Sequence, residues 1–339
     1  MDTQTDISPA SATGERQWNG PLFIVGMPRS GTKLLRGLLG QNSLVRIPTY
    51  ETDFIPHIAR WVKDHGEPRN PDAFFAFYQS LERAPYFVFR KRDAQPFDWK
   101  QWRAACAGRF DAAALFEGFV RLETGAGFAD GVIWGDKSPK YIEHLPLLVQ
   151  LFPRARIVHL VRDVRDYSVS IRKAWGKDVR RAAARWNADV ARAHDLCLQM
   201  PVRFHEVRYE DLLAEPEREL RRLAKFIGVP FSPDMLQTAR PVEHVGDAHG
   251  RRDIKRDNVG KYSVELSRRE IEAIEGLAWR GMRALGYVPT IATGPREMSR
   301  LQLTLLRLKD GLALARSAAR SRGLRGSLSF FTNHQRVSH

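Results

Sequence analysis

One short loop constrains this chain more than any other feature of its sequence. Residues 22–25 (LFIV) are apolar, the loop 26–33 (GMPRSGTK) follows, and leucines at helical spacing occupy 34–39. A strand that turns through such a loop into a helix leaves several backbone N–H groups facing one hollow. Those donors and the positive end of the helix suit phosphate or sulfate oxygens. The pattern therefore predicts an anion-binding strand–loop–helix unit near the start of an α/β domain.

The spacing of Gly26 and Gly31 matches the P-loop of nucleotide hydrolases. In that loop the second glycine precedes a lysine and then a serine or threonine that holds magnesium. Here the order is Thr32 then Lys33, and no hydroxyl residue follows the lysine. We expect a loop that binds an anion without a metal, because it offers a planar arginine, hydroxyls and a lysine as donors. The candidate binding residues are Arg29, Ser30, Gly31, Thr32 and Lys33.

Further apolar runs alternate with helical patterns along the chain. This alternation predicts an α/β fold, in which a P-loop-type parallel β-sheet is flanked by helices. Ser267 and Glu270 have the spacing of a capping box at the start of the last of these helices. The expected strands lie at 132–134, 157–161 and 202–207, and the expected helices at 141–151, 163–175, 180–199, 217–227 and 267–285.

Aromatic residues are concentrated in one part of the sequence. Residues 50–119 hold sixteen of the 34 rings, without the alternation of a strand. We expect a helical insertion over 50–130 that covers the ligand-facing edge of the sheet on the acceptor side. Most of its rings are expected to form its own core.

The length of 339 residues suits one large domain with extensions. Residues 1–19 are polar and predict a disordered arm, residues 20–290 a single domain, and residues 291–339 a basic C-terminal extension. The formal net charge of +15 suggests an anionic partner. The charge is spread over the body as well as the extension, which argues against a nucleic-acid binder.

The C-terminal extension carries nine lysines and arginines against two acidic residues. Leu301, Leu305, Leu308 and Leu312 would share one face of a helix there. A basic amphipathic pattern over 296–325 is typical of peripheral contact with an anionic membrane. The same pattern also fits a helix that packs on the body or on a second copy in a homo-oligomer.

Neither the hydropathy nor the cysteine content indicates an exported or membrane-spanning protein. No apolar run reaches eighteen residues, and the polar start has no secretory pattern. Cys106 and Cys197 cannot form a disulfide framework and suit a reducing compartment. We expect a cytoplasmic protein that can attach peripherally to the inner membrane surface.

A second anion-binding pattern follows the strand at 157–161. The run 157–170 (IVHLVRDVRDYSVS) places Arg162 at the strand end and Ser170 about two turns into the next helix. Together, the runs 23–32 (FIVGMPRSGT) and 157–170 resemble sulfotransferases that use 3′-phosphoadenosine-5′-phosphosulfate, most closely the bacterial and tyrosylprotein branch. The resemblance spans residues 20–288. It implies that the first loop binds the 5′-phosphosulfate, and that Arg162 and Ser170 bind the 3′-phosphate.

Two later segments add to this resemblance. Residues 207–212 (VRYEDL) are similar to a family segment near the adenine, which implies a role for Tyr209 beside the base. Residues 255–262 (KRDNVGKY) partly match the family loop that closes over the 3′-phosphate. The resemblance implies that Lys255, Arg256 and Lys261 are candidates for that contact. Lys33 departs from the usual second threonine of the first loop.

The resemblance also implies the catalytic groups. Residues 135–140 (GDKSPK) are similar to the family segment whose lysine approaches the leaving group, here Lys137. Residues 47–56 (IPTYETDFIP) are similar to the segment whose glutamate accepts the proton of the acceptor, here Glu51. Asp53 and His57 are the alternative bases. Arg29 would act with Lys137 on the transferred group.

These assignments imply an in-line sulfuryl transfer from 3′-phosphoadenosine-5′-phosphosulfate to a hydroxyl or amine, with no metal. The acceptor is left open among small molecules, glycans, lipids and peptides. One alternative is a magnesium-dependent P-loop kinase of a small metabolite, with Asp163 as a magnesium ligand. The other is a non-catalytic anion-binding protein that works through its C-terminal extension.

Overall fold

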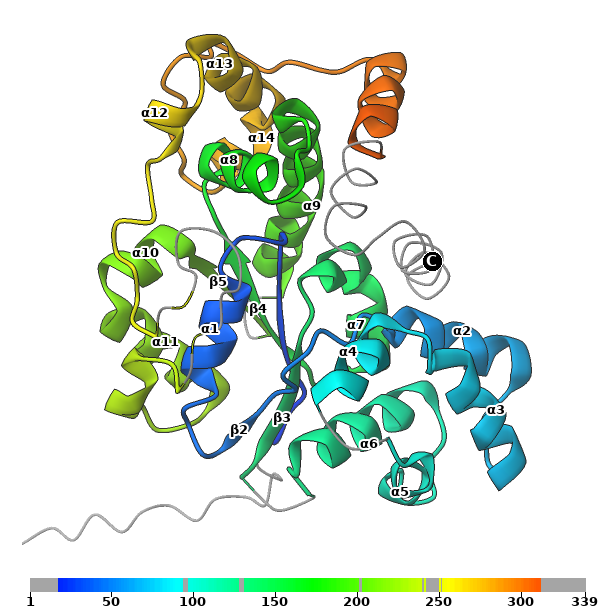
Figure 1. Ribbon diagram of the computed structural model, residues 1–339. Coiled ribbons are helices and arrows are strands. Elements are labelled where there is room, and N and C mark those ends of the chain that lie inside the picture. Colours follow the sequence, from blue (N-terminus) through cyan, green and yellow to red (C-terminus); the bar gives the residue numbers. More distant parts are fainter. Residues whose placement is uncertain are drawn as a thin grey trace, which may run out of the picture.

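The computed structural model describes residues 18–93, 97–127, 131–200, 203–239, 241, 250 and 252–311. Within these residues, five parallel strands form one sheet in the order β2-β3-β1-β4-β5, flanked by helices (Figure 1). The expected α/β fold is confirmed. The strands are β1 (Leu22–Gly26), β2 (Val45–Arg46), β3 (Ile133–Lys137), β4 (Arg156–Val161) and β5 (Phe204–Arg208).

The central strand β1 fixes where a ligand can bind. Its five residues are all buried, and it pairs with β3 on one side and with β4 on the other. Ile24 is in register with Lys137, and Gly26 is in register with Leu160. The chain thus leaves β1 at a point where the strand order reverses, and ligands of open α/β sheets bind at such a point.

Alternate side chains of β1 point to two separate cores, as expected for a strand buried on both faces. Leu22 and Ile24 pack with α1 (Thr32–Leu39), α10 (Tyr209–Ala214) and α11 (Pro216–Ile227). Phe23 and Val25 face the larger core. That core includes residues of α7 (Leu145–Leu151), α8 (Val164–Trp175), α9 (Val179–Gln199), α13 (Arg268–Leu277) and α14 (Trp279–Ala284).

The aromatic region forms helices, as its lack of alternation predicts, and they lie together at the lower right of Figure 1. Ring centroids of Phe54 and Phe119 are 5.0 Å apart, and those of Trp102 and Phe119 are 5.1 Å apart. Phe116 continues this cluster to Phe23 of β1, at 6.2 Å. Aromatic packing therefore joins the insertion to the sheet. Its helices are α2 (Ile55–His65), α3 (Pro71–Leu81), α4 (Pro85–Asp93), α5 (Trp99–Ala105) and α6 (Ala112–Thr124).

Several boundaries differ from the sequence predictions. The helix expected at 141–151 is a 3₁₀ helix, η1 (Pro139–His144), followed by α7, which has a proline in its first turn. The helix expected at 267–285 breaks at Ala278 into α13 and α14, although its capping box is present. The sequence did not predict β2, because a strand of two residues is too short to show an alternation of apolar and polar side chains. Two short elements that the sequence did not predict are η2 (Pro233–Leu236) and α12 (Tyr262–Glu265).

The described part of the chain begins and ends with residues that pack on the body. Trp18, expected in the disordered arm, donates to the carbonyl of Arg154 at 2.8 Å and stacks on the guanidinium of Arg156. A helix begins at Arg300 and continues to the last described residue, 311. None of the helices in the described ranges is long and apolar enough to cross a bilayer. The rest of the arm and Leu312 lie outside these ranges.

Candidate active site

The loop after β1 closes tightly over the start of α1. Gly31 has φ of 96°, a conformation that favours glycine, and Arg29 adopts φ of 74° at a cost in backbone strain. A side chain at Gly31 would meet the ring of Tyr209 at 2.5 Å. Glycine is therefore required here by both conformation and space. Ser30 and Thr32 are buried within the loop.

The two predicted anion-binding elements lie in contact. Arg162 at the end of β4 donates to the carbonyls of Arg29 at 3.3 Å and of Asn258 at 3.0 Å. Arg29 Nε donates to Ser170 Oγ at 3.4 Å. Arg162 is buried and makes no salt bridge with Asp163 or Asp166. The structure thus brings Arg29, Arg162 and Ser170 together.

Asp163 is engaged in a structural role. Its carboxylate accepts from the backbone N–H of Arg165 and pairs with the Arg165 guanidinium at 2.6 Å. That guanidinium also pairs with Glu275, at 2.8 Å. A carboxylate that caps α8 and holds an arginine is poorly placed to serve as a magnesium ligand.

The segment after residue 255 is held over α8 near the first loop. Asp166 accepts from the backbone N–H groups of Gly260 at 2.6 Å and Tyr262 at 3.0 Å. Asn258 Nδ2 donates to the hydroxyl of Tyr209 at 2.8 Å, and the guanidinium of Arg162 lies over the Tyr209 ring. The segment therefore reaches the site through its backbone and Asn258. Of its predicted cations, Lys255 and Lys261 are partly buried and Arg256 is exposed.

The two predicted catalytic groups form a pair at the carboxyl end of β3. Lys137 Nζ lies 2.5 Å from Glu51 Oε1, and the side chain of Lys137 is 1% exposed while that of Glu51 is 35% exposed. Burial lowers the pKa of Lys137, the negative charge of Glu51 opposes that shift, and the nearby charges of Arg36 and Lys33 add to it.

A cluster of hydroxyls fixes the segment that carries Glu51. Ser138 Oγ accepts from the backbone N–H groups of Thr52 at 2.9 Å and Asp53 at 3.3 Å. The hydroxyl of Tyr141 accepts from the backbone N–H of Ile55 at 3.1 Å. Ser138 and Tyr141 were not predicted from the sequence. Ser138 follows Lys137 directly and Tyr141 comes three residues later, but their partners lie 86 residues away.

Two buried carboxyl groups accompany this pair. Burial raises the pKa of Asp53 and of Asp136 to about 7 each, and the charge of Glu51 adds to both shifts. Neither carboxylate oxygen of Asp136 has a hydrogen-bond partner among the described residues. The hydroxyls of Ser138 and Thr52 are near enough to offset part of the shift at Asp136.

His57, the other alternative base, belongs to the insertion. Its Nε2 lies 2.8 Å from Ser80 Oγ, which itself donates to the carbonyl of Phe77. Nε2 must then carry the proton and donate to Ser80. Burial lowers the pKa of His57 to about 4. The ring thus acts as a hydrogen-bond donor between α2 and α3.

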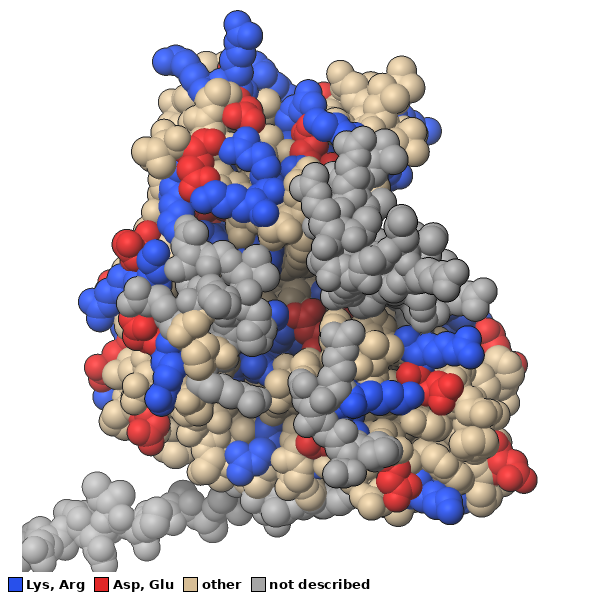
Figure 2. Space-filling view, in the orientation of Figure 1, with Lys and Arg blue, Asp and Glu red and all other residues tan. Residues whose placement is uncertain are grey.

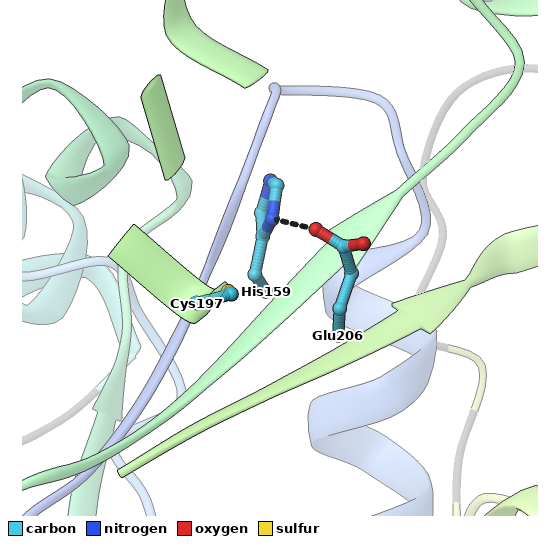
Figure 3. A group of neighbouring side chains, drawn as sticks. All are labelled: His159, Cys197 and Glu206. Carbon is cyan, nitrogen blue, oxygen red and sulfur yellow. Dashed lines mark hydrogen bonds and ion pairs between the residues drawn. The ribbon is translucent and has the colours of Figure 1, made fainter. Parts of the chain in front are cut away.

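Another group of side chains on the sheet has the composition of a metal site. His159 of β4, Cys197 of α9 and Glu206 of β5 have ligand atoms within 4.8 Å of one another (Figure 3). Glu206 accepts from Nδ1 of His159 at 3.0 Å and from Nδ1 of His194 at 3.0 Å. These hydrogen bonds pair the partly buried carboxylate with histidines of β4 and α9, so we assign the group a role in packing α9 on the sheet.

Figure 2 shows a recess near the centre of the face in view, with lysine and arginine side chains beside it. A glycine-bounded loop after β1, a buried arginine at the end of the neighbouring β4 and a lysine at the end of β3 meet at one edge of the sheet, an arrangement that suits an anionic ligand. The model of the Sulfotransferase family matches residues 21–233. The chain belongs to the sulfotransferase family.

Individual relatives support the same family. Protein-tyrosine sulfotransferase 1 of Danio rerio is 28% identical, over 68% of this chain and 58% of its own length. An omega-hydroxy-beta-dihydromenaquinone-9 sulfotransferase of Mycobacterium tuberculosis is 31% identical, over 62% of this chain and 63% of its own. The chain spans only 30% of an Aquifex aeolicus relative that is 25% identical. The chain thus covers less than two thirds of the length of these curated relatives.

The fold is shared with a solved sulfotransferase domain of the curacin biosynthetic pathway. The superposition covers 80% of this chain and 99% of that domain, with a TM-score of 0.53 and 19% sequence identity.

Proposed function

We propose that the protein transfers a sulfuryl group from 3′-phosphoadenosine-5′-phosphosulfate to a hydroxyl or amine of an acceptor. The observation that carries this proposal is the contact of two anion-binding elements beside the Lys137–Glu51 pair. One element suits each end of a donor with two anionic groups. The family membership supports the reaction class.

The polar atoms of the site fit such a donor. Ser30 Oγ and Arg162 Nε are buried and have no hydrogen-bond partner among the described residues. Buried donors of this kind are costly unless a ligand satisfies them. In this proposal the loop with Arg29, Ser30, Gly31, Thr32 and Lys33 holds the 5′-phosphosulfate. Arg162 and Ser170 hold the 3′-phosphate, Tyr209 flanks the adenosine, and Lys255, Arg256 and Lys261 complete the 3′-phosphate site.

The chemistry follows from the pair at the end of β3. The acceptor oxygen or nitrogen forms a bond to sulfur while the bond from sulfur to the 5′-phosphate oxygen breaks. Glu51 takes the proton of the acceptor, and Lys137 and Arg29 stabilise the charge that develops on the bridging oxygen. In the free protein Lys137 Nζ lies 2.5 Å from Glu51 Oε1, so the cation and the proposed base are already placed beside each other.

No step in this proposal needs a divalent ion, because the charge is balanced by arginine and lysine side chains. The engagement of Asp163 with Arg165 also favours sulfuryl transfer over the magnesium-dependent kinase. We expect donor binding to be unchanged by EDTA.

The acceptor would approach from the aromatic insertion, since Glu51 precedes α2 directly. By their names, relatives act on protein tyrosine and on an omega-hydroxylated menaquinone. Both of those acceptors present a hydroxyl on a largely apolar group. We propose a hydroxyl acceptor of this kind, such as a tyrosyl peptide, a lipid or a small phenol, and a direct assay should include glycans as the polar alternative.

The free cysteines support a reducing, cytoplasmic setting for this reaction. Cys106 and Cys197 are both buried, and burial raises the pKa of each to about 12. Such thiols are unreactive and need no oxidising compartment.

Calorimetry with 3′-phosphoadenosine-5′-phosphate and with ATP plus magnesium tests the donor. We expect binding of the bisphosphate, with and without EDTA, and weaker binding of ATP. Labelled donor is then incubated with phenols, polyprenyl alcohols, glycans and tyrosyl peptides, and transfer is measured for the wild type and for Glu51→Gln. Binding of ATP with magnesium and none of the bisphosphate would favour the kinase. Bisphosphate binding without transfer to any acceptor class would favour an anion-binding protein.

A further inference from the structure

The helix that begins at Arg300 is fixed to the body by one face. Asp310 is buried, and its carboxylate accepts from the backbone N–H of Asp178 at 2.9 Å and from Arg181 at 2.6 Å. Leu306 is buried on the same face, and Lys309 reaches Asp178 at 3.3 Å. These contacts anchor the helix beside the start of α9, at the upper right of Figure 1.

The predicted apolar stripe of this helix points away from the body. Leu301, Leu305 and Leu308 are 70%, 57% and 64% exposed. At 3.6 residues per turn, the three leucines lie within a sector of about 60°, on the side opposite Leu306 and Asp310. The stripe is therefore not what holds the helix on the protein. An exposed row of leucines on a fixed helix indicates a surface made for another apolar phase.

Cations flank the leucine stripe on both sides. At 100° per residue Lys309 lies next to the stripe on one side, and Arg300 and Arg307 lie further round the helix on the other; all three are exposed, and Lys309 also pairs with Asp178 at 3.3 Å. Leucines between flanking cations fit an interface where acyl chains lie next to negative headgroups. The long basic side chains can reach those headgroups while the leucines enter the apolar layer.

A second copy of the chain fits this surface less well. In a symmetric dimer, each surface patch meets the same patch on the partner. The two sets of arginine and lysine side chains would then face each other across the leucines. No carboxylate on the outward face of residues 300–311 offsets them, since Asp310 is buried against the body. Residues 291–339 carry a surplus of seven positive charges, which adds to that repulsion and favours an anionic partner.

We propose that the stripe Leu301–Leu305–Leu308 and its flanking cations form a docking surface for an anionic lipid bilayer. The helix lies flat on the headgroup region and does not cross the membrane. This inference is independent of the proposed sulfuryl transfer, because it rests on a helix outside the nucleotide site.

Flotation of the full chain with lipid vesicles tests the proposal. One set of vesicles is phosphatidylcholine alone, and the other contains phosphatidylglycerol as well. We expect flotation with the anionic vesicles only, and release as the salt concentration rises. The double variant Leu301→Glu/Leu305→Glu should bind at least about tenfold more weakly, since burial of one leucine is worth more than the ~1.4 kcal/mol of a tenfold change.

The matched control is Leu198→Glu/Val264→Glu, which makes the same charge change at exposed apolar residues on α9 and α12. It should float like the wild type. Both double variants should keep the wild-type thermal unfolding temperature. Equal binding by both variants would overturn the proposal, as would flotation with neutral vesicles alone. The stripe would instead belong to a contact with a second copy if the wild type bound no vesicles and formed a dimer in light scattering, and if only Leu301→Glu/Leu305→Glu made that dimer dissociate.

Discussion

At the scale of single residues, the most consequential feature is a buried lysine whose close partner is a carboxylate open to solvent. Lys137 is almost inaccessible, and Glu51 is the exposed member of the pair. Burial of an ammonium group is costly unless it is paired. The pair therefore keeps a buried cation at the carboxyl end of β3 and leaves the carboxylate partly exposed to solvent.

Glu51→Gln should separate donor binding from proton transfer. The amide keeps the shape of the side chain but cannot accept the proton, so we expect kcat to fall by about 10²–10⁴-fold. The affinity for 3′-phosphoadenosine-5′-phosphate should stay near that of the wild type. Transfer assays and calorimetry on the same preparation measure both. Asp64→Asn, an exposed substitution on α2, is the control. Unchanged transfer by Glu51→Gln would direct attention to Asp53.

Asp136 should make the stability of the fold depend on pH. Its pKa is about 7 in the folded protein against 3.8 for the free side chain, so between these values the folded state binds more protons. The free energy of unfolding therefore increases as the pH falls below 7, and the contribution of Asp136 becomes constant near pH 4. Asp136→Asn removes the buried charge. It should raise the unfolding temperature by a few degrees at pH 8 and by much less at pH 5. Calorimetric scans at pH 8 and pH 5 measure the two unfolding temperatures. An equal increase at both pH values would contradict a raised pKa for Asp136.

At the scale of elements, the site depends on how η1 holds the segment before α2. Three backbone N–H groups of residues 52–55 donate to Ser138 and Tyr141, which lie one and four residues after Lys137. One turn of 3₁₀ helix thus sets the distance between the lysine and the glutamate.

Ser138→Ala should test that positioning. The change removes the acceptor for two buried N–H groups and loosens Glu51, so we expect kcat to fall by roughly 10–10²-fold. Donor affinity should change little, because the first loop and Arg162 are untouched. Ser138→Thr, which keeps the hydroxyl, should restore most of the rate. A loss of donor affinity equal to the loss of kcat would indicate general disruption of β3 instead.

The same elements show what the sequence can and cannot predict. The loop 26–33 and the Arg162–Ser170 pattern could be predicted because each is a local run with its own chemistry. Nothing local pairs Ser138 with Thr52, because that contact needs β2 beside β3, with the whole insertion between them in the sequence. The break at Ala278 and the brief β2 also depend on packing. The leucine stripe was predicted, but its outward direction follows from Asp310, whose partners lie over a hundred residues away.

At the scale of the whole molecule, the sheet order turns two distant local motifs into one site. β1 and β4 are neighbours, so the loop after β1 and Arg162 after β4 lie at the same edge. Arg162 then donates to Arg29 and to Asn258, which joins the first loop, the sheet and the later segment. A donor with phosphates at both ends should therefore stabilise the whole fold by bridging these parts.

This bridging can be measured with two nucleotides that differ only in the 3′-phosphate. A ligand at a hundred times its Kd stabilises the folded state by about 2.7 kcal/mol. 3′-Phosphoadenosine-5′-phosphate should thus raise the unfolding temperature more than adenosine 5′-monophosphate does. Arg162→Ala should abolish that difference and leave the effect of the monophosphate, whereas Arg29→Ala should weaken both. Arg221→Ala, an exposed change on α11, is the control. If the bisphosphate kept its advantage in Arg162→Ala, the 3′-phosphate would have to lie elsewhere, with Lys255, Arg256 and Lys261 as the next residues to replace.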